Sequence, residues 1–549
     1  MGVPGFFVWL MKNNIHNNII QNKLDNIDAL YFDANCLFHP KCFDILKLYS
    51  NVTDVDKLEE LMINRIIKYI NYIIGFVKPS TLIYIAVDGV APIAKINQQR
   101  KRRYKSVIDK EYNDFLNDKY NINKNTSWSN IVITPGTNFM IKLDKALNIL
   151  KNENSKIIYS SYKQEGEGEH KIIRYIKQNE TNKTIRHVIY GLDADLIFLA
   201  MSAYTKYSEI FLLRELQHLK SIKTQLTEDV NEPLCFLSIN NVINTYNEYI
   251  LNKLKENSDF IDIDLTQNYD FSKDFILLGF LLGNDFIPNL PSINIRINGI
   301  EYLTEAYCKM FEYMKSYIYD YNKKEINWNN FKLLLTYLTD IEDDFFKNDI
   351  PNYKNKTNYR RCNKTGPYDI ELWKHDNLKD IIFEDKIQLG NGSKEEYKFR
   401  YYEHHFNSRI NQNKFINNIC KNYLEMIEWI CKYYFDIEMP SWQFCYYFEN
   451  TPFASDLVTY LEINHIKTII PFKTIIPFKN VIKIETQLLS VIPSFYSNIL
   501  KECNIDITKF KNKQTQFMFP IKYKLDYSKD QYWMCETILP MLDIDLLLI

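Results

Sequence analysis

The sequence has little of several features that define other classes of protein. Glycine contributes only 14 of 549 residues, and no uninterrupted apolar run reaches the ~18 residues of a membrane span. The ten cysteines form no CxxC pair and no His/Cys cluster at zinc spacing, which predicts a reduced, intracellular protein. The apolar start, MGVPGFFVWL, lacks a basic segment and contains Pro4 and Gly5, so it is not typical of a signal peptide.

The chain also lacks a large net charge. Charged residues make up 25% and the formal net charge is −1. This balance argues against nucleic-acid binding through bulk positive charge, but it leaves room for a local basic patch beside an acidic cavity. Hydrophobic residues make up 46%, so the chain can bury a large core, and its length predicts two domains.

Short apolar segments alternate with helical patterns from residue 1 to about 300. Helices are expected at Val55–Phe76 and Lys142–Asn152, and strands at Ile27–Phe32, Leu82–Val87, Lys156–Ser160 and His187–Leu192. This alternation predicts an α/β fold with a mostly parallel sheet flanked by helices.

The texture of the sequence changes further along the chain. We expect residues 1–339 to form the α/β domain and the Asn-, Lys- and Asp-rich residues 340–395 to form an insertion or linker. Residues 396–549 are expected to form a second, aromatic-rich and mainly helical domain. The tandem TIIPFK at 468–479 is a local duplication, because two copies are too few for a repeat fold.

Acidic residues lie where the predicted strands end. Asp33 follows IDALYF, and Asp88 follows LIYIAV. The pair Glu167 and Glu169 comes shortly after KIIYSS, and the pair Asp193 and Asp195 follows HVIYGL. In an open parallel sheet these ends meet at one edge, where ligands bind. Any single acid is explained equally well by the surface position of strand ends. Six acids after four successive strands, with a seventh, Asp285, in LLGNDF, favour a shared site.

Such a carboxylate cluster needs positive charge between its members, because like charges in a partly buried site raise each other's pKa. Hard divalent cations prefer oxygen ligands, and Mg²⁺ is favoured when phosphate is the substrate. Two ions about 4 Å apart would activate a water and stabilise the leaving oxygen in phosphodiester hydrolysis.

A basic segment, GVAPIAKINQQRKRRYK, follows Asp88 directly. Pro92 suits a first helical turn. Spacings of i, i+4, i+7 and i+8 then place four side chains on one face: Lys95, Gln99, Arg102 and Arg103. Arginine forks bind phosphate in a bidentate way, and lysine adds a point charge. A solvated basic helix or a nuclear localisation sequence is the alternative, but the neighbouring metal-ligand candidate favours a phosphate pocket.

Together these segments closely resemble the Xrn-type 5′-to-3′ exoribonucleases. The matching stretches are MGVPGFFVWL, FDANCLFH, VDGVAPIAKINQQRKRRY, ITPGTNFM, GEGEHK, YGLDADLI and LGNDFIPNLP, which cover residues 1 to about 300. A second region matches more loosely through EWICKYYF, PSWQF, PFASDL and QLLSVIPS. The combination in this order is specific, whereas no single stretch would suffice.

The resemblance implies a fold related to flap-type nucleases, with a site completed by the second region. It implies that seven acids bind two Mg²⁺, for which Mn²⁺ can substitute: Asp33, Asp88, Glu167, Glu169, Asp193, Asp195 and Asp285. It further implies that Lys95, Gln99, Arg102 and Arg103 hold the 5′-phosphate. His39 and Trp442, which no spacing of their own singles out, would stack on the first base.

This sequence departs from the family pattern at three positions. Glu165 stands where proline is usual, Ile93 replaces an arginine of the basic segment, and Phe444 replaces the second tryptophan of Ser-Trp-x-Trp. The first departure adds an acid near the site, the second removes a positive charge, and the third weakens the match around Trp442.

The expected function is therefore removal of mononucleotides from the 5′ end of 5′-monophosphorylated RNA. A flap-type 5′ DNA nuclease and a non-catalytic RNA-binding relative are the alternatives; the basic helix with Gln99 argues against the first and the retained acids against the second. We expect a monomer without a membrane span. The cytoplasm is the favoured location, with the nucleus as the alternative, or the host cytoplasm if the origin is viral. Decapping or RNA-decay partners cannot be read from the sequence.

Overall fold

The computed structural model describes most of the chain. The described residues are 6, 9–10, 19–122, 128–216, 227–256, 269–358, 360–408, 412–464 and 481–548. The tandem TIIPFK and most of the opening MGVPGFFVWL lie outside them. Within the described residues, no helix has both the length and the apolar character that a membrane crossing requires.

The chain divides into two compact units, each assembled from segments that are far apart in the sequence. Unit 1 consists of Met1–Trp9, Ile243–Phe478 and Leu525–Glu536, and unit 2 of Leu10–Val242, Lys479–Lys524 and Thr537–Ile549. These units cross the boundaries expected at residues 339 and 396, and the functional division proposed there stays a prediction.

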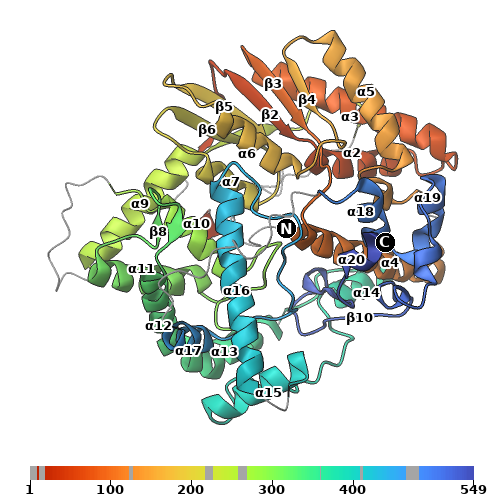
Figure 1. Cartoon of the computed structure of the whole chain (residues 1–549). Coiled ribbons are helices and arrows are strands. Elements are labelled where there is room, and N and C mark those ends of the chain that lie inside the picture. Colours follow the sequence, from red (N-terminus) through yellow and green to blue (C-terminus); the bar gives the residue numbers. More distant parts are fainter. Residues whose placement is uncertain are drawn as a thin grey trace. The chain divides into compact units, whose positions relative to one another are not determined.

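Unit 2 is built on a seven-stranded, mostly parallel sheet (Figure 1). The strand order is β1-β7-β6-β5-β2-β3-β4, with antiparallel pairing only where β7 meets β6 and β1. The strands are β1 Ile20–Gln21, β2 Ala29–Asp33, β3 Leu82–Ala86, β4 Ile157–Ser160, β5 Ile185–Tyr190, β6 Ser208–Glu215 and β7 Leu234–Ser238. The mostly parallel sheet predicted from the sequence is confirmed.

The four predicted strands correspond to β2, β3, β4 and β5, with ends shifted by at most two residues. At the end of β5, Gly191 and Leu192 belong to the loop that carries Asp193 and not to the strand. Strands β6 and β7 were not among the predicted ones. They extend the sheet beyond β5 and bury almost all of their side chains.

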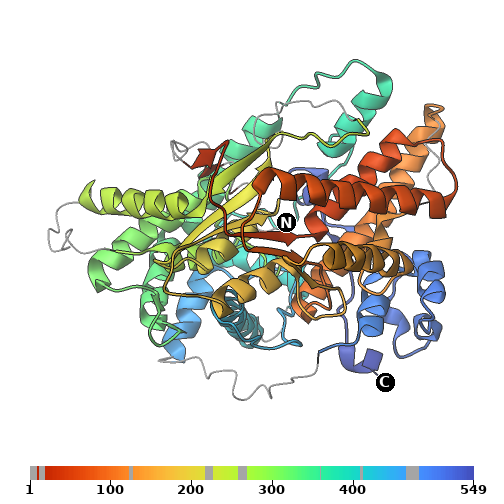
Figure 2. The same ribbon diagram turned by 90° about the horizontal axis from the view of Figure 1, so that it is seen from above.

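Helices cover both faces of the sheet (Figures 1 and 2). One face carries α2 (Asn35–Leu48), α3 (Val55–Val77) and α5 (Asn138–Glu153); the other carries α6 (Gly168–Gln178), with α7 (Asp195–Ser202) beside it. Successive side chains of β2 point to opposite faces of the sheet and therefore pack against both helical layers. Leu30 and Phe32 enter the core under α3, whereas Tyr31 meets Tyr84 and Tyr175 below α6.

Unit 1 is helical and rich in aromatic residues, as predicted for the second region. Trp429 packs against Phe286 and Tyr433, with ring centroids 5.4 and 4.8 Å apart. Its α-helices are most of α9 (Ile239–Glu256), α10 Ser272–Leu281, α11 Gly299–Met314, α12 Trp328–Asp344, α13 Ile350–Asn358, α14 Pro367–Asp376, α15 Lys394–Phe406, α16 Gln412–Phe435 and α17 Ala454–Ile463. It also contains the two-residue strands β8 (Tyr319–Asp320) and β9 (Glu325–Ile326), and the π-helix η2 (Phe345–Asp349).

Residues 340–395, expected as an insertion or linker, contain regular structure. The end of α12, η2, α13 and α14 all lie in this segment. Phe346, in the middle of η2, packs against Tyr397 and Phe453. A polar composition therefore concealed a buried aromatic contact that anchors the start of the segment.

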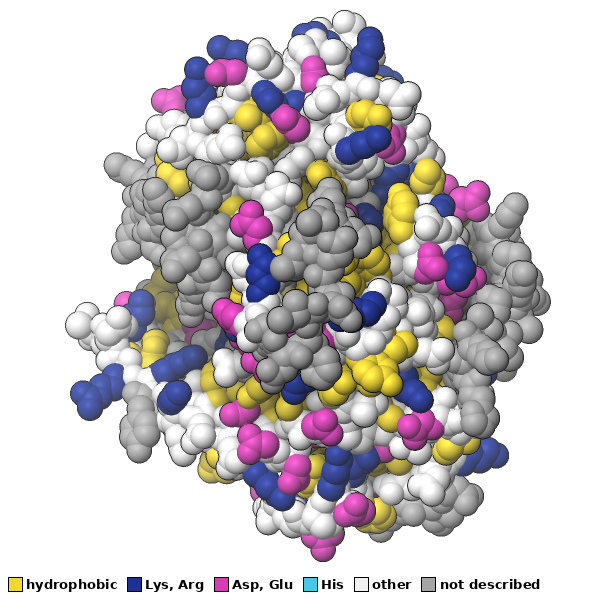
Figure 3. Space-filling view, turned by 90° about the vertical axis from the view of Figure 1, so that its left-hand side faces the viewer, with side chains coloured by type: hydrophobic (Ala, Val, Ile, Leu, Met, Phe, Trp, Pro, Cys, Tyr) yellow, Lys and Arg dark blue, Asp and Glu magenta, His cyan; other side chains and the backbone are white. Residues whose placement is uncertain are grey.

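Acidic and basic side chains are interspersed over the described part of the face shown in Figure 3. This agrees with the net charge of −1.

The helix formed by that basic segment, α4 (Ile93–Lys119), is held by the C-terminal parts of unit 2. Arg100 donates to the carbonyl oxygen of Pro540 at 2.7 Å and to that of Met518. Tyr523 donates to the carbonyl of Tyr104 at 2.9 Å, and Thr537 to that of Lys101 at 3.0 Å. These segments contain α18 Ile484–Val491, η4 Ser494–Tyr496, α19 Ser497–Glu502, η5 Thr508–Phe510, η6 Gln516–Met518, the start of β10 (Lys524–Leu525), β11 Thr537–Ile538 and α20 Ile544–Leu548.

Replacing Arg100 tests this anchoring. Arg100→Met leaves the carbonyls of Pro540 and Met518 without their charged donor, and hydrogen bonds from charged groups contribute about 1.5–3 kcal/mol each. We expect the free energy of unfolding, measured by urea denaturation, to fall by about 3 kcal/mol. Arg102→Met, an exposed position on the same helix, is the control and should change it by less than about 0.5 kcal/mol. Equal effects of the two substitutions would contradict the anchoring role.

Candidate active site

Six of the seven predicted acids come together at one edge of the sheet in unit 2. In the sheet, β3 and β4 lie on one side of β2, whereas β5, the next strand in the sequence, lies on the other side. The strand order therefore reverses between β2 and β5. Ligand sites of open parallel sheets lie at such a reversal, beyond the carboxyl ends of the strands. Asp33 ends β2 and is buried. The neighbouring acids are Asp88 after β3, Glu167 and Glu169 at the start of α6, Asp193 in the loop after β5, and Asp195 at the first position of α7.

The loops after β3 and β4 are joined backbone to backbone. Gly89 donates to the carbonyl of Gly166 at 2.9 Å, and Gly166 donates to the carbonyl of Val90 at 2.8 Å. A Cβ on Gly89 would lie 1.8 Å from the carbonyl oxygen of Gln164, so only glycine fits there. This close approach fixes Asp88 relative to the loop that leads to Glu167.

Gly168, at the first position of α6, brings the two groups of acids into contact. Its N–H donates to Oδ1 of Asp88 at 2.6 Å, as expected for a carboxylate at a helix N-terminus. A Cβ at this position would lie 2.8 Å from Oδ1 of Asp33 and 3.3 Å from Oδ1 of Asp88. The absence of a side chain at Gly168 therefore allows the two carboxylates to approach the helix.

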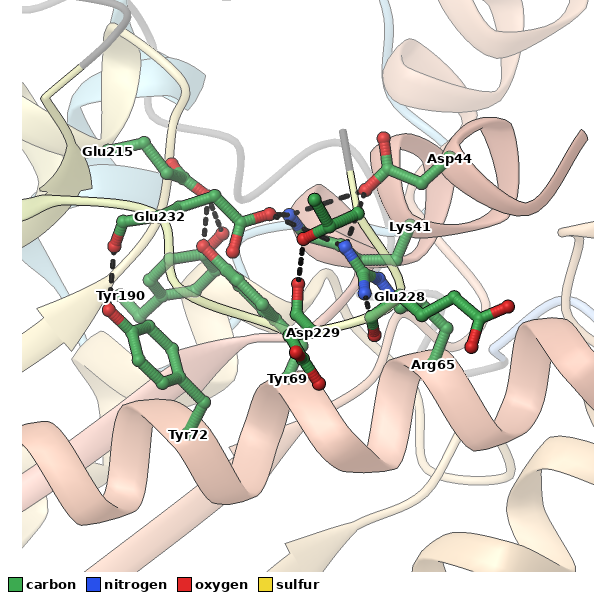
Figure 4. Close-up of polar contacts among 11 residues, drawn as sticks. Lys41, Asp44, Arg65, Tyr69, Tyr72, Tyr190, Glu215, Glu228, Asp229 and Glu232 are labelled. Atoms are coloured by element: carbon green, nitrogen blue, oxygen red, sulfur yellow. Dashed lines mark hydrogen bonds and ion pairs between the residues drawn. The ribbon is translucent and has the colours of Figure 1, made fainter. Parts of the chain in front are cut away.

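A second network of buried polar groups supports the end of β5 (Figure 4). Tyr190, its last residue, and Tyr69 of α3 both donate to Oε1 of Glu215, at 2.7 and 2.5 Å. Arg214, beside Glu215, donates to the carbonyl of Leu192, directly before Asp193. The network continues through Lys41, whose Nζ lies 2.6 Å from Oε1 of Glu232. Among these side chains, Arg214 contacts the backbone of the β5–α7 loop directly.

Burial and the negative charges of neighbouring acids shift the pKa values of Asp33 and Glu169. Burial raises the pKa of Asp33 well above the usual range of a carboxyl, and the charges of Asp88, Asp193 and Asp195 raise it further, while Lys95 lowers it. Burial likewise raises the pKa of Glu169, together with the charge of Asp195. Without added positive charge, the fold therefore disfavours ionisation at this edge.

The acids fit a divalent cation as ligands. They offer only carboxylate oxygens, which suit a hard ion such as Mg²⁺. Oε2 of Glu169 is buried and accepts no hydrogen bond from any described residue. As they stand, no three His, Cys, Asp or Glu side chains of the described part of the chain converge on one point as ligands. Binding an ion would therefore draw carboxylates of the cluster together.

The predicted basic face lies beside this cluster. Nζ of Lys95 forms a salt bridge of 2.5 Å with Oε2 of Glu167. Arg103 also lies near the acids: burial and then the charge of Arg102 lower its pKa to about 10, against the opposing effect of Asp88. His39 of α2 shares these neighbours, because burial, then Arg103 and Arg102, lower the pKa of its imidazole to about 4. His39 is therefore neutral at physiological pH.

Arg103 is held in one orientation by the ITPGTNFM stretch. Its Nε and Nη2 donate to Oγ1 of Thr134 at 3.2 and 2.9 Å, and Nη1 donates to the carbonyl of Gln99 at 3.2 Å. Gln99 has a buried side-chain Oε1 that accepts no hydrogen bond within the described residues. A guanidinium has five N–H donors, so part of the Arg103 fork remains for a ligand.

Asp285 and Trp442 belong to unit 1. Asp285 is half-buried in the loop after α10, and Trp442 is 8% exposed, next to Ser441, whose carbonyl accepts a hydrogen bond from Nε1 of Trp429. Their assignment to the metal site and to base stacking stays a prediction.

Comparison with known families agrees with this geometry. The profile described as "XRN 5'-3' exonuclease N-terminus" matches residues 1–216, and the one described as "Xrn1 helical domain" matches residues 268–369 and 369–549. The chain belongs to the Xrn family. The family resemblance that the sequence motifs carried is confirmed.

Among the relatives, 5'-3' exoribonuclease 1 of Homo sapiens is 28% identical over 603 aligned residues, covering 99% of this chain and 33% of that protein. The corresponding figures for 5'-3' exoribonuclease 1 of Saccharomyces cerevisiae are 33% identity over 64% of this chain and 23% of the relative. For 5'-3' exoribonuclease 2 of Eremothecium gossypii the identity is 29%, over 63% of this chain and 42% of the relative. The chain thus spans less than half the length of these Xrn-family relatives.

Sequence reasoning missed four residues that shape this Xrn-family site. Gly168 and Lys171 lie in the GEGEHK stretch, Thr134 in ITPGTNFM, and Asn35 in FDANCLFH. Asn35, for example, accepts the backbone N–H of Asp88 at 3.0 Å through its side-chain oxygen. The available signal was their position inside the matching stretches, directly beside residues that were assigned a role.

The raised pKa values predict how stability depends on pH. An acid whose pKa is raised by folding contributes stability that is present below its unfolded pKa and lost as the pH rises through the folded pKa. In EDTA at about pH 8, Asp33→Asn should therefore raise the free energy of unfolding, by about 1.4 kcal/mol for each pKa unit of the shift. The gain should shrink as the pH falls and vanish below about pH 3, where the wild-type carboxyl is protonated in both the folded and the unfolded state.

Asp144 supplies a control of opposite sign. Burial alone would raise its pKa, but hydrogen bonds from Ser161, Tyr159 and Lys163 outweigh burial and lower it. Its stability contribution is therefore present above the unfolded pKa and lost as the pH falls. Asp144→Asn should destabilise the protein at about pH 8 under the same conditions. A loss of stability in Asp33→Asn at this pH would show that the cluster is not electrostatically strained.

Proposed function

We propose that the chain is a 5′-to-3′ exoribonuclease that removes mononucleotides from 5′-monophosphorylated RNA. The observation that carries the proposal is the contact between Lys95 and Glu167, which joins the basic face of α4 to the acidic cluster. An enzyme that cuts one nucleotide at a time has to hold the terminal phosphate at a fixed, short distance from the scissile bond. The relatives of the Xrn family that match this chain are named 5'-3' exoribonucleases, which supports the same function.

In this proposal the six acids of unit 2 hold two Mg²⁺ ions, with Asp285 as a further ligand and Mn²⁺ as a substitute. Bound ions of this kind supply a nucleophilic water and charge for the leaving oxygen. The carboxylates fix the positions of the ions, and the loop contacts of Gly89, Gly166 and Gly168 fix the carboxylates.

The residues of α4 select the RNA end. Lys95 and Arg102 supply charge, Gln99 supplies an amide, and Arg103 supplies a guanidinium that Thr134 has already oriented. A pre-oriented fork loses little conformational freedom on binding, which favours a compact monophosphate over a capped or triphosphorylated end. Stacking of the first base on His39 and Trp442 completes the proposal, and the neutral state of His39 suits it for that role.

The activity is tested with labelled single-stranded RNA that carries either a 5′-monophosphate or a 5′-hydroxyl. We expect Mg²⁺-dependent release of mononucleotides from the monophosphate substrate, and no release by Asp193→Asn, which still binds RNA because the basic face is intact. Flapped DNA is the comparison substrate. Faster cutting of flapped DNA than of RNA would favour a DNA nuclease, and Mg²⁺-dependent turnover by Asp193→Asn would contradict the metal assignment.

The phosphate pocket is tested by Arg103→Ala. Loss of one charge-assisted contact, about 1.5–3 kcal/mol, should lower kcat/KM on 5′-monophosphate RNA by about 10- to 100-fold. Activity on 5′-hydroxyl RNA should change much less, so the preference between the two ends falls. Lys105→Ala removes a charge of the same helix that is paired with Asp109, and it should keep the preference. An unchanged preference in Arg103→Ala would exclude this pocket.

A further inference from the structure

Lys171 is a buried lysine at the centre of the acidic site. It lies in α6, one turn after Glu167 and two residues after Glu169, and is only 6% exposed. Its Nζ donates to the carbonyl of Val87 at 2.8 Å and to the carbonyl of Ser161 at 3.0 Å. Both partners are backbone groups, so these bonds fix the course of the chain and not merely a side chain.

The two carbonyls belong to the segments that carry the acids. Val87 directly precedes Asp88, and Ser161 begins the loop that runs from β4 to Glu167. A single ammonium group therefore connects the end of β3, the end of β4 and the first turns of α6. The backbone bonds between Gly89, Gly166 and Val90 close the other side of the same junction.

Burying an ammonium group is costly unless it is well hydrogen-bonded. The charges of Asp88 and Glu165 act on Lys171, but its hydrogen bonds go to the carbonyls of Val87 and Ser161. A lysine that only balanced the negative charge of the acids would be expected to form an ion pair with one of the carboxylates. The geometry instead resembles the outer-shell contacts that orient metal ligands.

We propose that Lys171 is a positioning residue that sets the distance between Asp88 and the pair Glu167 and Glu169. The inference rests on the proposed function, because it gives these acids the role of metal ligands. Lys171 touches neither substrate nor metal in this scheme; it acts through the backbone on both sides of the site.

Positioning and charge balance predict opposite effects of Lys171→Met on cation binding. Loss of a positive charge beside Asp88 would by itself tighten binding of a divalent cation. Loss of the two backbone contacts would let the ligand loops separate and weaken binding. Removal of outer-shell contacts commonly lowers metal affinity by about 10- to 100-fold, and we expect a loss in this range.

The experiment measures Mn²⁺ binding to the full chain without RNA, by isothermal titration calorimetry and by the electron paramagnetic resonance of free Mn²⁺. Lys398→Met is the matched control: the side chain of Lys398, in unit 1, is 18% exposed, and its Nζ lies 2.5 Å from Oδ1 of Asp456 and donates to Oγ of Ser455 at 3.2 Å, neither of which is a proposed metal ligand. Both variants should lose thermal stability, but only Lys171→Met should raise the Mn²⁺ dissociation constant. It should also raise the Mg²⁺ concentration needed for half-maximal RNA cleavage.

A second variant keeps the test decisive if Lys171→Met does not fold. Lys171→Gln retains a hydrogen-bond donor without the charge, and should weaken Mn²⁺ binding less than Lys171→Met but in the same direction. Unchanged or tighter Mn²⁺ binding by a folded Lys171 variant would overturn the positioning role and leave the proposed function intact. A wild-type chain that binds no Mn²⁺ at all would overturn the proposed function and this inference together.

Discussion

Mutual repulsion among carboxylates at one edge of the sheet is the constraint around which unit 2 is arranged. Asp33 and Glu169 have raised pKa values because the fold buries them next to other acids. Such a site is stable only if the surrounding chain is held rigidly enough to resist separation of the loops. Three sets of contacts hold the loops: the backbone hydrogen bonds of Gly89 and Gly166, the close approach of Asp33 and Asp88 to Gly168, and the two hydrogen bonds of Lys171.

The same constraint explains why the site has one acidic and one basic side. A helix that places Lys95 against Glu167 supplies positive charge where the acids need it, and the same charge suits a phosphate. Thr134 restrains Arg103, so the basic side is organised in part by a stretch that contains none of the predicted ligands. Binding energy for a phosphate and relief of repulsion among the acids thus come from a shared set of side chains.

The sequence allowed four strands of the sheet and the position of six acids near their ends to be predicted, because both depend on local patterns. Apolar runs mark β2, β3, β4 and β5, and an acid after each run lies at the carboxyl edge of any parallel sheet. The role of Lys171 could not be predicted, since it depends on the distance between two loops that are joined only in three dimensions. The packing of Phe346 in unit 1 was hidden for the same reason, behind a polar neighbourhood. Long-range contacts leave no periodic signal, and the C-terminal segments that pack on α4 are the clearest example.

The anchoring of α4 by distant segments has a consequence for how the protein is made. The hydrogen bonds of Arg100 reach carbonyls 418 and 440 positions further along the chain. During synthesis, which proceeds from the N-terminus, the basic helix therefore emerges long before its supports exist. Unit 2 can reach its final packing only after residue 540 has left the ribosome. Contacts of such long sequence separation also slow folding, because the loop-closure entropy has to be overcome first. A nascent chain would thus carry all six acids of this unit well before the unit can complete its packing.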